Sequence, residues 1–179
     1  IRIGVNGGSL EKEILAKYGV SARGMVESAK SHVKILQKFD FEDICISVKA
    51  STVALTIDAY RMLSDEVDYP LHLGVTEAGT LKMGLIKSSI GLGTLLSQGI
   101  GDTIRVSLTA DPAEEIYFAK EILGSLGLRE SAINFVSCPT CGRTKINLES
   151  LATEIEHKLG GLEEQFKAEG RKSITVAVM

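Results

Sequence analysis

An α/β fold built on parallel strands is the fold class that this sequence predicts. Short segments rich in β-branched residues alternate with segments that have the 3.6-residue hydrophobic period of an amphipathic helix. A helix between successive strands makes a crossover connection, and crossovers join parallel strands. The chain has 179 residues, 44% of them hydrophobic, which is enough for one domain with a full core, or for one domain and part of another.

Six segments are predicted strands because they are short, apolar and bounded by turn residues. They are 1–5, 44–48, 71–75, 103–108, 133–136 and 174–178. Between the first five, apolar residues recur on one helical face over 22–36, 53–67 and 116–126, and Asp111 before Pro112 marks a helix start. The segment 82–97 is rich in glycine, serine and leucine almost all round, which predicts a helix buried on all sides.

We expect a domain boundary near residue 130, where the strand–helix repeat changes character. The last predicted helix, 148–166, is longer and more charged than the others, and Gly160 and Gly161 interrupt it. The sequence therefore predicts two domains, residues 1–129 and residues 130–179.

Composition argues against several kinds of partner. The net charge is −3, and no run of lysines or arginines stands out, so neither nucleic acid nor an anionic membrane surface is expected as a partner. The longest apolar runs are far shorter than a membrane span, which predicts a soluble protein. With only three cysteines the chain does not resemble a secreted disulfide scaffold, and a reducing cytoplasm fits better.

The first four predicted strands alternate between an apolar row and a row of polar or small residues. The second row contains Arg2, Gly4 and Asn6; Cys45, Ser47 and Lys49; His72, Gly74 and Thr76; and Thr103, Arg105 and Ser107. Parallel strands covered on both faces normally read as continuous apolar runs. The alternation therefore indicates either a sheet with one face in water or a β/α barrel whose interior carries a polar site at the strand ends.

The polar row contains Arg2, Lys49, His72 and Arg105 and no acid. Burying several cations together is costly unless an anion neutralises them. A phosphorylated ligand would do so, because Arg suits bidentate phosphate contacts and Lys a point contact. Glu77 follows the third strand directly, where a carboxylate can pass protons to a ligand or simply pair with a cation.

Cys138 and Cys141 lie three residues apart behind the fifth strand, and Cys45 is the only other cysteine. Two thiolates do not complete an ordinary iron–sulfur or zinc site. The pair is therefore either part of a metal site that needs further ligands or a redox dithiol. A β/α aldolase or synthase without a metal is a third alternative, with Lys49 as a Schiff-base residue.

Six stretches of the sequence, in order, resemble 4-hydroxy-3-methylbut-2-enyl diphosphate synthases. They are RIGVN at 2–6, SVKAS at 47–51, LHLGVTEAG at 71–79, KSSIGLG at 87–93, GIGDTIRVSL at 99–108 and FVSCPTCGRT at 135–144. The resemblance runs along essentially the whole chain. At Thr52 the sequence departs from the family, which more often has an acid there, and this affects only local loop contacts.

The resemblance implies the second half of a (β/α)8 TIM-type barrel, followed by the start of a small α+β iron–sulfur domain. It also implies an oxidoreductase of the non-mevalonate isoprenoid pathway. Such enzymes reductively open 2-C-methyl-D-erythritol 2,4-cyclodiphosphate, with loss of water, to 4-hydroxy-3-methylbut-2-enyl diphosphate. Two electrons arrive from ferredoxin or flavodoxin through a 4Fe-4S cluster, and the full-length bacterial enzyme is a homodimer.

The same resemblance assigns roles to residues of this chain. The substrate-binding group consists of Arg2, Asn6, Lys49, His72, Arg105 and Ser107. Glu77 is implied as the catalytic acid near the reacting oxygens, and Cys138 and Cys141 as two of the cluster ligands. We expect the first barrel strands to precede Ile1 and the remaining ligands, a cysteine and a glutamate, to follow Met179, so that this fragment alone is inactive.

Overall fold

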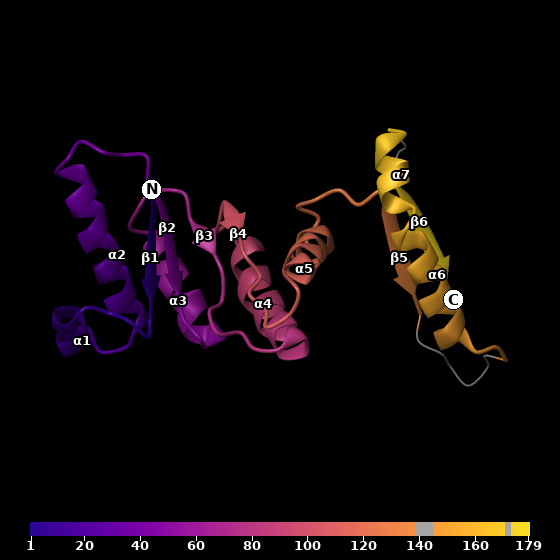
Figure 1. The fold of residues 1–179 in the computed structure, drawn as a ribbon, viewed down its shortest axis with the longest axis horizontal. Helices are drawn as coiled ribbons and strands as arrows, with labels where there is room; N and C mark the ends of the chain where they lie inside the picture. The colour runs from indigo at the N-terminus through magenta and orange to yellow at the C-terminus, as the bar shows by residue number, and fades with distance from the viewer. Residues whose placement is uncertain (139–144, 171–172) are drawn as a thin grey trace. The chain divides into compact units, whose positions relative to one another are not determined.

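The computed structural model describes residues 1–138, 145–170 and 173–179, and the chain divides into two compact units. The first unit is Ile1–Leu126 and the second is Gly127–Met179. Figure 1 shows the strands and helices of each unit. Among the described residues, no helix is both long enough and apolar enough to cross a membrane.

The first unit repeats a strand–helix pattern four times, as the alternating periodicity predicts. Its strands are β1 (Arg2–Asn6), β2 (Cys45–Lys49), β3 (His72–Leu73) and β4 (Thr103–Ile104). Its helices are α1 (Lys12–Tyr18), α2 (Ala22–Gln37), α3 (Val53–Ser64), α4 (Leu81–Leu96) and α5 (Pro112–Ser125). β1 pairs with β2 and β3 with β4, both in parallel, and a parallel bridge between Ile46 and Leu71 joins the two pairs. The prediction of parallel strands is confirmed.

The third and fourth strands are shorter than predicted. Ladder pairing between them covers only two residues on each, although the predicted segments were 71–75 and 103–108. The Arg105 N–H still donates to the Leu73 carbonyl, but the Thr76 N–H donates to Ala50, in the segment after β2. The chain beyond Leu73 therefore keeps single hydrogen bonds to both neighbours, while the regular β3–β4 ladder is limited to two residues on each strand.

The apolar row of the strands forms the core against the helices. It contributes the buried residues Ile3, Val5, Ile46, Val48, Leu73 and Val106. α2 adds Met25, Val26, Ala29 and Val33, α3 adds Ala59, Tyr60 and Leu63, and α4 adds Leu92 and Leu95. Burying apolar surface of this kind is the main favourable contribution to folding, so one face of each strand packs in the core.

Capping residues begin two of the core helices. The Ser21 hydroxyl accepts a hydrogen bond from the Gly24 N–H at the start of α2. At α5 the Asp111 carboxylate accepts from the Ala113 N–H, and Pro112 occupies the first helical position. Both caps satisfy N–H groups that a helix cannot satisfy itself, and the predicted start of α5 is confirmed.

α4 is not buried on all sides, so that part of the prediction is wrong. Its small residues Gly84, Ser88 and Gly91 are buried, and Gly84 lies against Leu108 and Gly91 against Val75. The opposite face exposes Ile86 and Ile90, which are 43% and 53% accessible. Glycine and serine let this face of the helix pack closely, but they do not bury the opposite face.

The second unit pairs two parallel strands with a helix beside them. β5 (Ile133–Ser137) runs beside β6 (Ile174–Val178), and α6 (Leu148–Gly160) and α7 (Glu163–Ala168) lie between them in the chain. α6 contacts β5 and buries Leu148. The predicted interruption at Gly160 and Gly161 is confirmed, because α6 ends there and α7 is a separate short helix.

Candidate functional site

The strand register brings the polar row onto one face of the sheet. Asn6 on β1 lies opposite Lys49 on β2, and Arg2 lies opposite Cys45. His72 on β3 lies opposite Thr103 on β4. Since side chains of paired residues in neighbouring strands point to the same face, the row predicted from alternation is continuous across the four strands.

Lys49 is the half-buried cation at the carboxyl end of β2. Its side chain lies against Gly74, where an added Cβ would be 2.9 Å from Lys49 Cε and 3.0 Å from Lys49 Nζ. Lys49 forms no ion pair with a described carboxylate. Burial lowers the pKa of Lys49, and the positive charges of Arg2 and Arg105 lower it further. The ammonium is therefore a group that a bound anion would stabilise.

His72 lies among the same cations but is buried, with 8% of its surface accessible. Its Nδ1 is 2.8 Å from the Thr103 hydroxyl, and its Nε2 has no partner among the described residues. Burial lowers the pKa of His72 to about 4, and Lys49, Arg2 and Arg105 contribute in that order. The imidazole is therefore neutral at physiological pH.

Arg105 follows β4 and is held by an acid from a neighbouring helix. Glu115 on α5 lies 3.4 Å from Arg105 Nε and accepts a hydrogen bond from the Leu108 N–H at 2.9 Å. The Arg105 side chain is 58% accessible. Among the described residues this contact involves only the Nε side of the guanidinium, so the two terminal nitrogens can bind a ligand.

Three more predicted site residues of this unit end or follow strands at their carboxyl ends, whereas Arg2 is exposed at the start of β1. Asn6 is half-buried at the end of β1, and its side-chain oxygen accepts from the Gly8 N–H at 3.0 Å. Ser107 is half-buried two residues after Arg105. Glu77 is exposed beyond β3 and has a φ of +51°, a backbone conformation that costs a residue with a side chain about 1 kcal/mol or more.

The two predicted cluster ligands belong to the second unit. Cys138 is exposed directly after β5, and its N–H donates to the Val178 carbonyl at 3.0 Å. Cys141 lies outside the described residues. Within residues 1–138, 145–170 and 173–179, no group of three or more His, Cys, Asp or Glu side chains could hold a metal ion.

Three residues that shape the site were missed by sequence reasoning. Glu115 comes from a helix rather than a strand, so alternation could not reveal it. Gly74 belongs to the predicted polar row, but its contact with Lys49 needs a three-dimensional model. Tyr60 was assigned to the core from helical periodicity, yet its hydroxyl donates to the His72 carbonyl at 2.6 Å.

Comparison with known families identifies both parts of the chain. The GcpE TIM-barrel domain matches residues 1–120, and the GcpE protein C-terminal domain matches residues 134–179. The chain belongs to the GcpE family. The predicted resemblance and the predicted TIM-barrel class are thereby confirmed.

Curated relatives in the GcpE family share most of the sequence. Proteins named 4-hydroxy-3-methylbut-2-en-1-yl diphosphate synthase (flavodoxin) are 61% identical in Clostridium tetani, 59% in Clostridium acetobutylicum and 56% in Geobacter sulfurreducens. Each match covers 100% of this chain and 49% of the relative. The chain thus spans about half the length of the curated relatives it matches.

Proposed function

We propose that the protein containing this chain converts 2-C-methyl-D-erythritol 2,4-cyclodiphosphate into 4-hydroxy-3-methylbut-2-enyl diphosphate in isoprenoid biosynthesis. The observation that carries the proposal is the half-buried Lys49, which lies in the positive field of Arg2 and Arg105 and has no carboxylate partner among the described residues. A diphosphate would supply the missing negative charge. The names of the GcpE relatives support this product.

The cationic row would bind the diphosphate through two kinds of contact. Arg105 can offer its two terminal nitrogens to one phosphate, while Lys49 acts as a compact point charge on another oxygen. Arg2, Asn6 and Ser107 line the same face and would complete the binding group. A neutral His72 would sit beneath them as a hydrogen-bonding group rather than a fourth cation.

Glu77 would act as the acid that exchanges protons with the reacting oxygens. It lies just past β3 on an exposed turn, and its positive φ holds the backbone in a rarely adopted conformation. Backbone strain of this kind clusters at functional sites, although Asp40 has a similar φ outside the candidate site. Ring opening with loss of water needs a proton for the departing oxygen, which a carboxylic acid can supply.

Cys138 and Cys141 would provide two ligands of a 4Fe-4S cluster. Cys138 fits, because its thiol is exposed at the end of a strand, but the described residues do not supply a complete ligand set. The remaining ligands would come from parts of the protein outside this chain. When bound, such a cluster would deliver the two electrons that reductive ring opening consumes.

The remaining features of the proposal rest on the family resemblance and on the length of the relatives. Residues 1–129 would form half of the barrel and residues 130–179 the first part of the cluster domain. The complete protein would be a cytoplasmic homodimer that accepts electrons from flavodoxin, the donor in the relatives' names, or from ferredoxin. The 179 residues alone would not turn over substrate.

Diphosphate binding is the first test, and calorimetric titration of the chain with the cyclodiphosphate measures it. Arg105→Ala should weaken binding about 30-fold, since a hydrogen bond to a charged group contributes roughly 2 kcal/mol. Arg61→Ala is the matched control, because Arg61 lies on α3 and its Nε bonds to Gln98. Equal affinity of Arg105→Ala and the intact chain would contradict the binding site.

Turnover requires a protein of the relatives' full length, purified without oxygen and supplied with reduced flavodoxin. Glu77→Gln should slow product formation while leaving substrate affinity nearly unchanged, because the amide cannot donate a proton as an acid. Iron and acid-labile sulfide should be present in near-equal amounts and should be lost in Cys138→Ser. A full-length protein that binds zinc instead, or that reacts normally with Gln at position 77, would contradict the proposed chemistry.

A further inference from the structure

The surroundings of Lys49 make its amine available for chemistry as well as for binding. Its Cε and Nζ lie against the backbone at Gly74, which keeps the side chain at the strand ends, and no described carboxylate pairs with it. Burial and two neighbouring guanidinium groups favour the uncharged amine. An uncharged amine is the nucleophilic form of lysine.

The arginine side chains near Lys49 favour reagents that carry a phosphate group. Arg2 and Arg105 attract phosphate, and Arg105 has terminal nitrogens free on the side away from Glu115. A molecule held there by its phosphate reacts with Lys49 if an electrophilic carbon lies one or two bonds from the phosphorus. Acyl phosphates meet this requirement, because a single oxygen joins their carbonyl carbon to phosphorus.

We propose that Lys49 is a site of covalent acylation by small acyl phosphates. The amine nitrogen forms a bond to the carbonyl carbon, the bond between that carbon and the bridging oxygen breaks, and phosphate leaves with the electron pair. The nitrogen loses one proton to water or to the departing phosphate, and the product is a neutral amide. The step needs no oxidant or reductant.

Acylation would remove one cation from the binding face and place an acyl group against Gly74. Diphosphate affinity would therefore fall, so the modification would regulate the same site. The inference rests on the proposed function only for the anion site, and it does not depend on which diphosphate binds there.

Mass spectrometry of the 179-residue chain after treatment with acetyl phosphate tests the proposal. Lys49 should be acetylated about tenfold faster than the exposed Lys12 and Lys34, because the bound phosphate holds the reacting atoms together. Inorganic pyrophosphate should protect Lys49 and leave the other two lysines unaffected. The comparison is made within one molecule, so it is independent of any effect of substitution on folding.

Acetic anhydride provides the matched reagent, because it carries no phosphate. Arg105→Ala should slow acetylation of Lys49 by acetyl phosphate much more than acetylation by acetic anhydride, because only acetyl phosphate needs the phosphate contact as well as the uncharged amine. Arg61→Ala should affect neither reaction. Labelling of Lys49 at the rate of Lys34, or labelling that pyrophosphate does not reduce, would overturn the proposal.

The two proposals fail separately. If Lys49 is labelled selectively but the cyclodiphosphate gives no protection, the acylation site holds and the proposed substrate is wrong. If the cyclodiphosphate binds and Lys49 is not selectively labelled, only the acylation proposal is overturned.

Discussion

The side chain of Lys49 lies so close to Gly74 that a methyl group on the glycine would touch it. An added Cβ would be 2.9 Å from Lys49 Cε, 3.0 Å from Lys49 Nζ and 3.1 Å from the Arg105 carbonyl oxygen. Real side chains keep a larger separation, so either the lysine or the backbone must move. The tip of a lysine is flexible, which makes Lys49 the group that yields.

Gly74→Ala should therefore weaken anion binding without unfolding the chain. We expect pyrophosphate affinity to fall about tenfold, equivalent to 1.4 kcal/mol, because Lys49 is displaced from Arg2 and Arg105. Calorimetric titration gives the affinity, and circular dichroism confirms that the variant is folded. Gly93→Ala on α4 is the control, since an added Cβ there meets nothing within 4 Å. A folded Gly74→Ala chain with unchanged affinity would contradict the role of Gly74 in placing Lys49 for anion binding.

His72 should make the chain less stable in acid. Its pKa is about 4 in the folded chain, compared with 6.5 when unperturbed, so below pH 6.5 the unfolded chain binds a proton that the folded chain does not. The free energy of unfolding should therefore fall as the pH drops from 6.5 to 4, by roughly 3 kcal/mol for the complete titration.

Urea unfolding of the intact chain and of His72→Gln across this pH window measures the effect. The glutamine variant lacks the titrating group, so the difference in free energy between the two proteins should change with pH. A constant difference from pH 6.5 to pH 4 would mean that His72 is protonated equally in both states.

Tyr60 links the backbones of β2 and β3 from within the core. Its buried hydroxyl donates to the His72 carbonyl at 2.6 Å and accepts from the Val48 N–H at 3.2 Å, and burial raises its pKa. Tyr60→Phe should lower the free energy of unfolding by about 1–3 kcal/mol, because two buried backbone groups lose their partner. The Tyr69 hydroxyl bonds to Glu42 and Gln37 in exposed positions, where water can replace it, so Tyr69→Phe should lower the free energy of unfolding by less than about 1 kcal/mol in chemical denaturation. Equal losses in the two variants would contradict the role of Tyr60.

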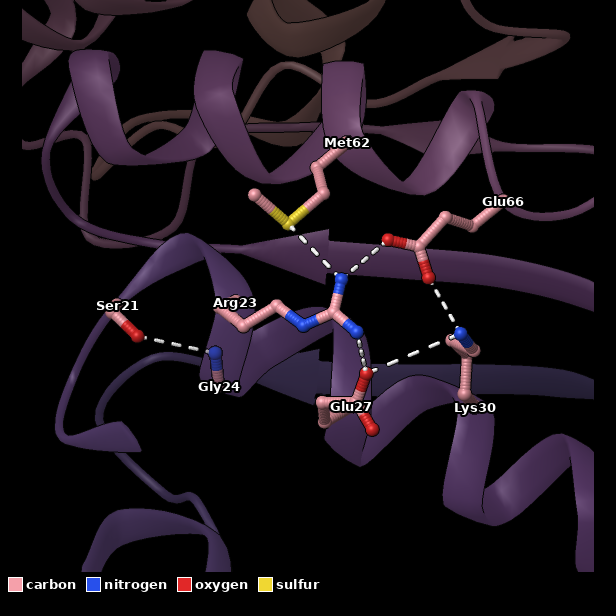
Figure 2. A network of polar contacts seen from close by, with 7 residues as sticks. All are labelled: Ser21, Arg23, Gly24, Glu27, Lys30, Met62 and Glu66. Atoms are coloured by element: carbon pink, nitrogen blue, oxygen red, sulfur yellow. Dashed lines mark hydrogen bonds and ion pairs between the residues drawn. The ribbon is translucent and has the colours of Figure 1, made fainter. Parts of the chain in front are cut away.

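Four charged side chains connect α2 to the end of α3 at the surface (Figure 2). Arg23 contacts both Glu27 and Glu66, and Lys30 lies 2.5 Å from Glu66. The hydrogen bond from Lys30 is the largest cause that lowers the pKa of Glu66, and the positive charges of Lys30 and Arg23 lower it further. The side chains are 23–45% accessible, so water and salt screen them.

The pairing of Arg23 with Glu66 should consequently contribute less than about 1 kcal/mol to the stability of the chain. A double-mutant cycle with Arg23→Ala and Glu66→Ala gives this coupling energy, and it should shrink as salt is added. A coupling energy well above about 1 kcal/mol that does not change at high salt would show that the ion pairs are shielded from solvent.

Much of the fold, and the shared face of the candidate site residues, could be predicted from the sequence. Periodicity located the strands and helices, because burial of one face leaves a repeat of two or of 3.6 residues. Alternation also placed Arg2, Lys49 and Arg105 on one face, since the apolar row had to face the helices. The same reasoning overstated the lengths of β3 and β4, because alternation reveals which face of a segment is buried but not how far its backbone stays regularly paired with its neighbour.

The sequence by itself therefore determined the α/β class, the GcpE resemblance and the cationic face. Tertiary structure decided how those cations are held. Glu115 contacts Arg105 from a helix ten residues along the chain, and Gly74, directly after β3, packs against the tip of Lys49. It also decided that His72 is buried and neutral. These relationships depend on distances between elements, whereas the pattern within one element depends only on which of its faces is buried.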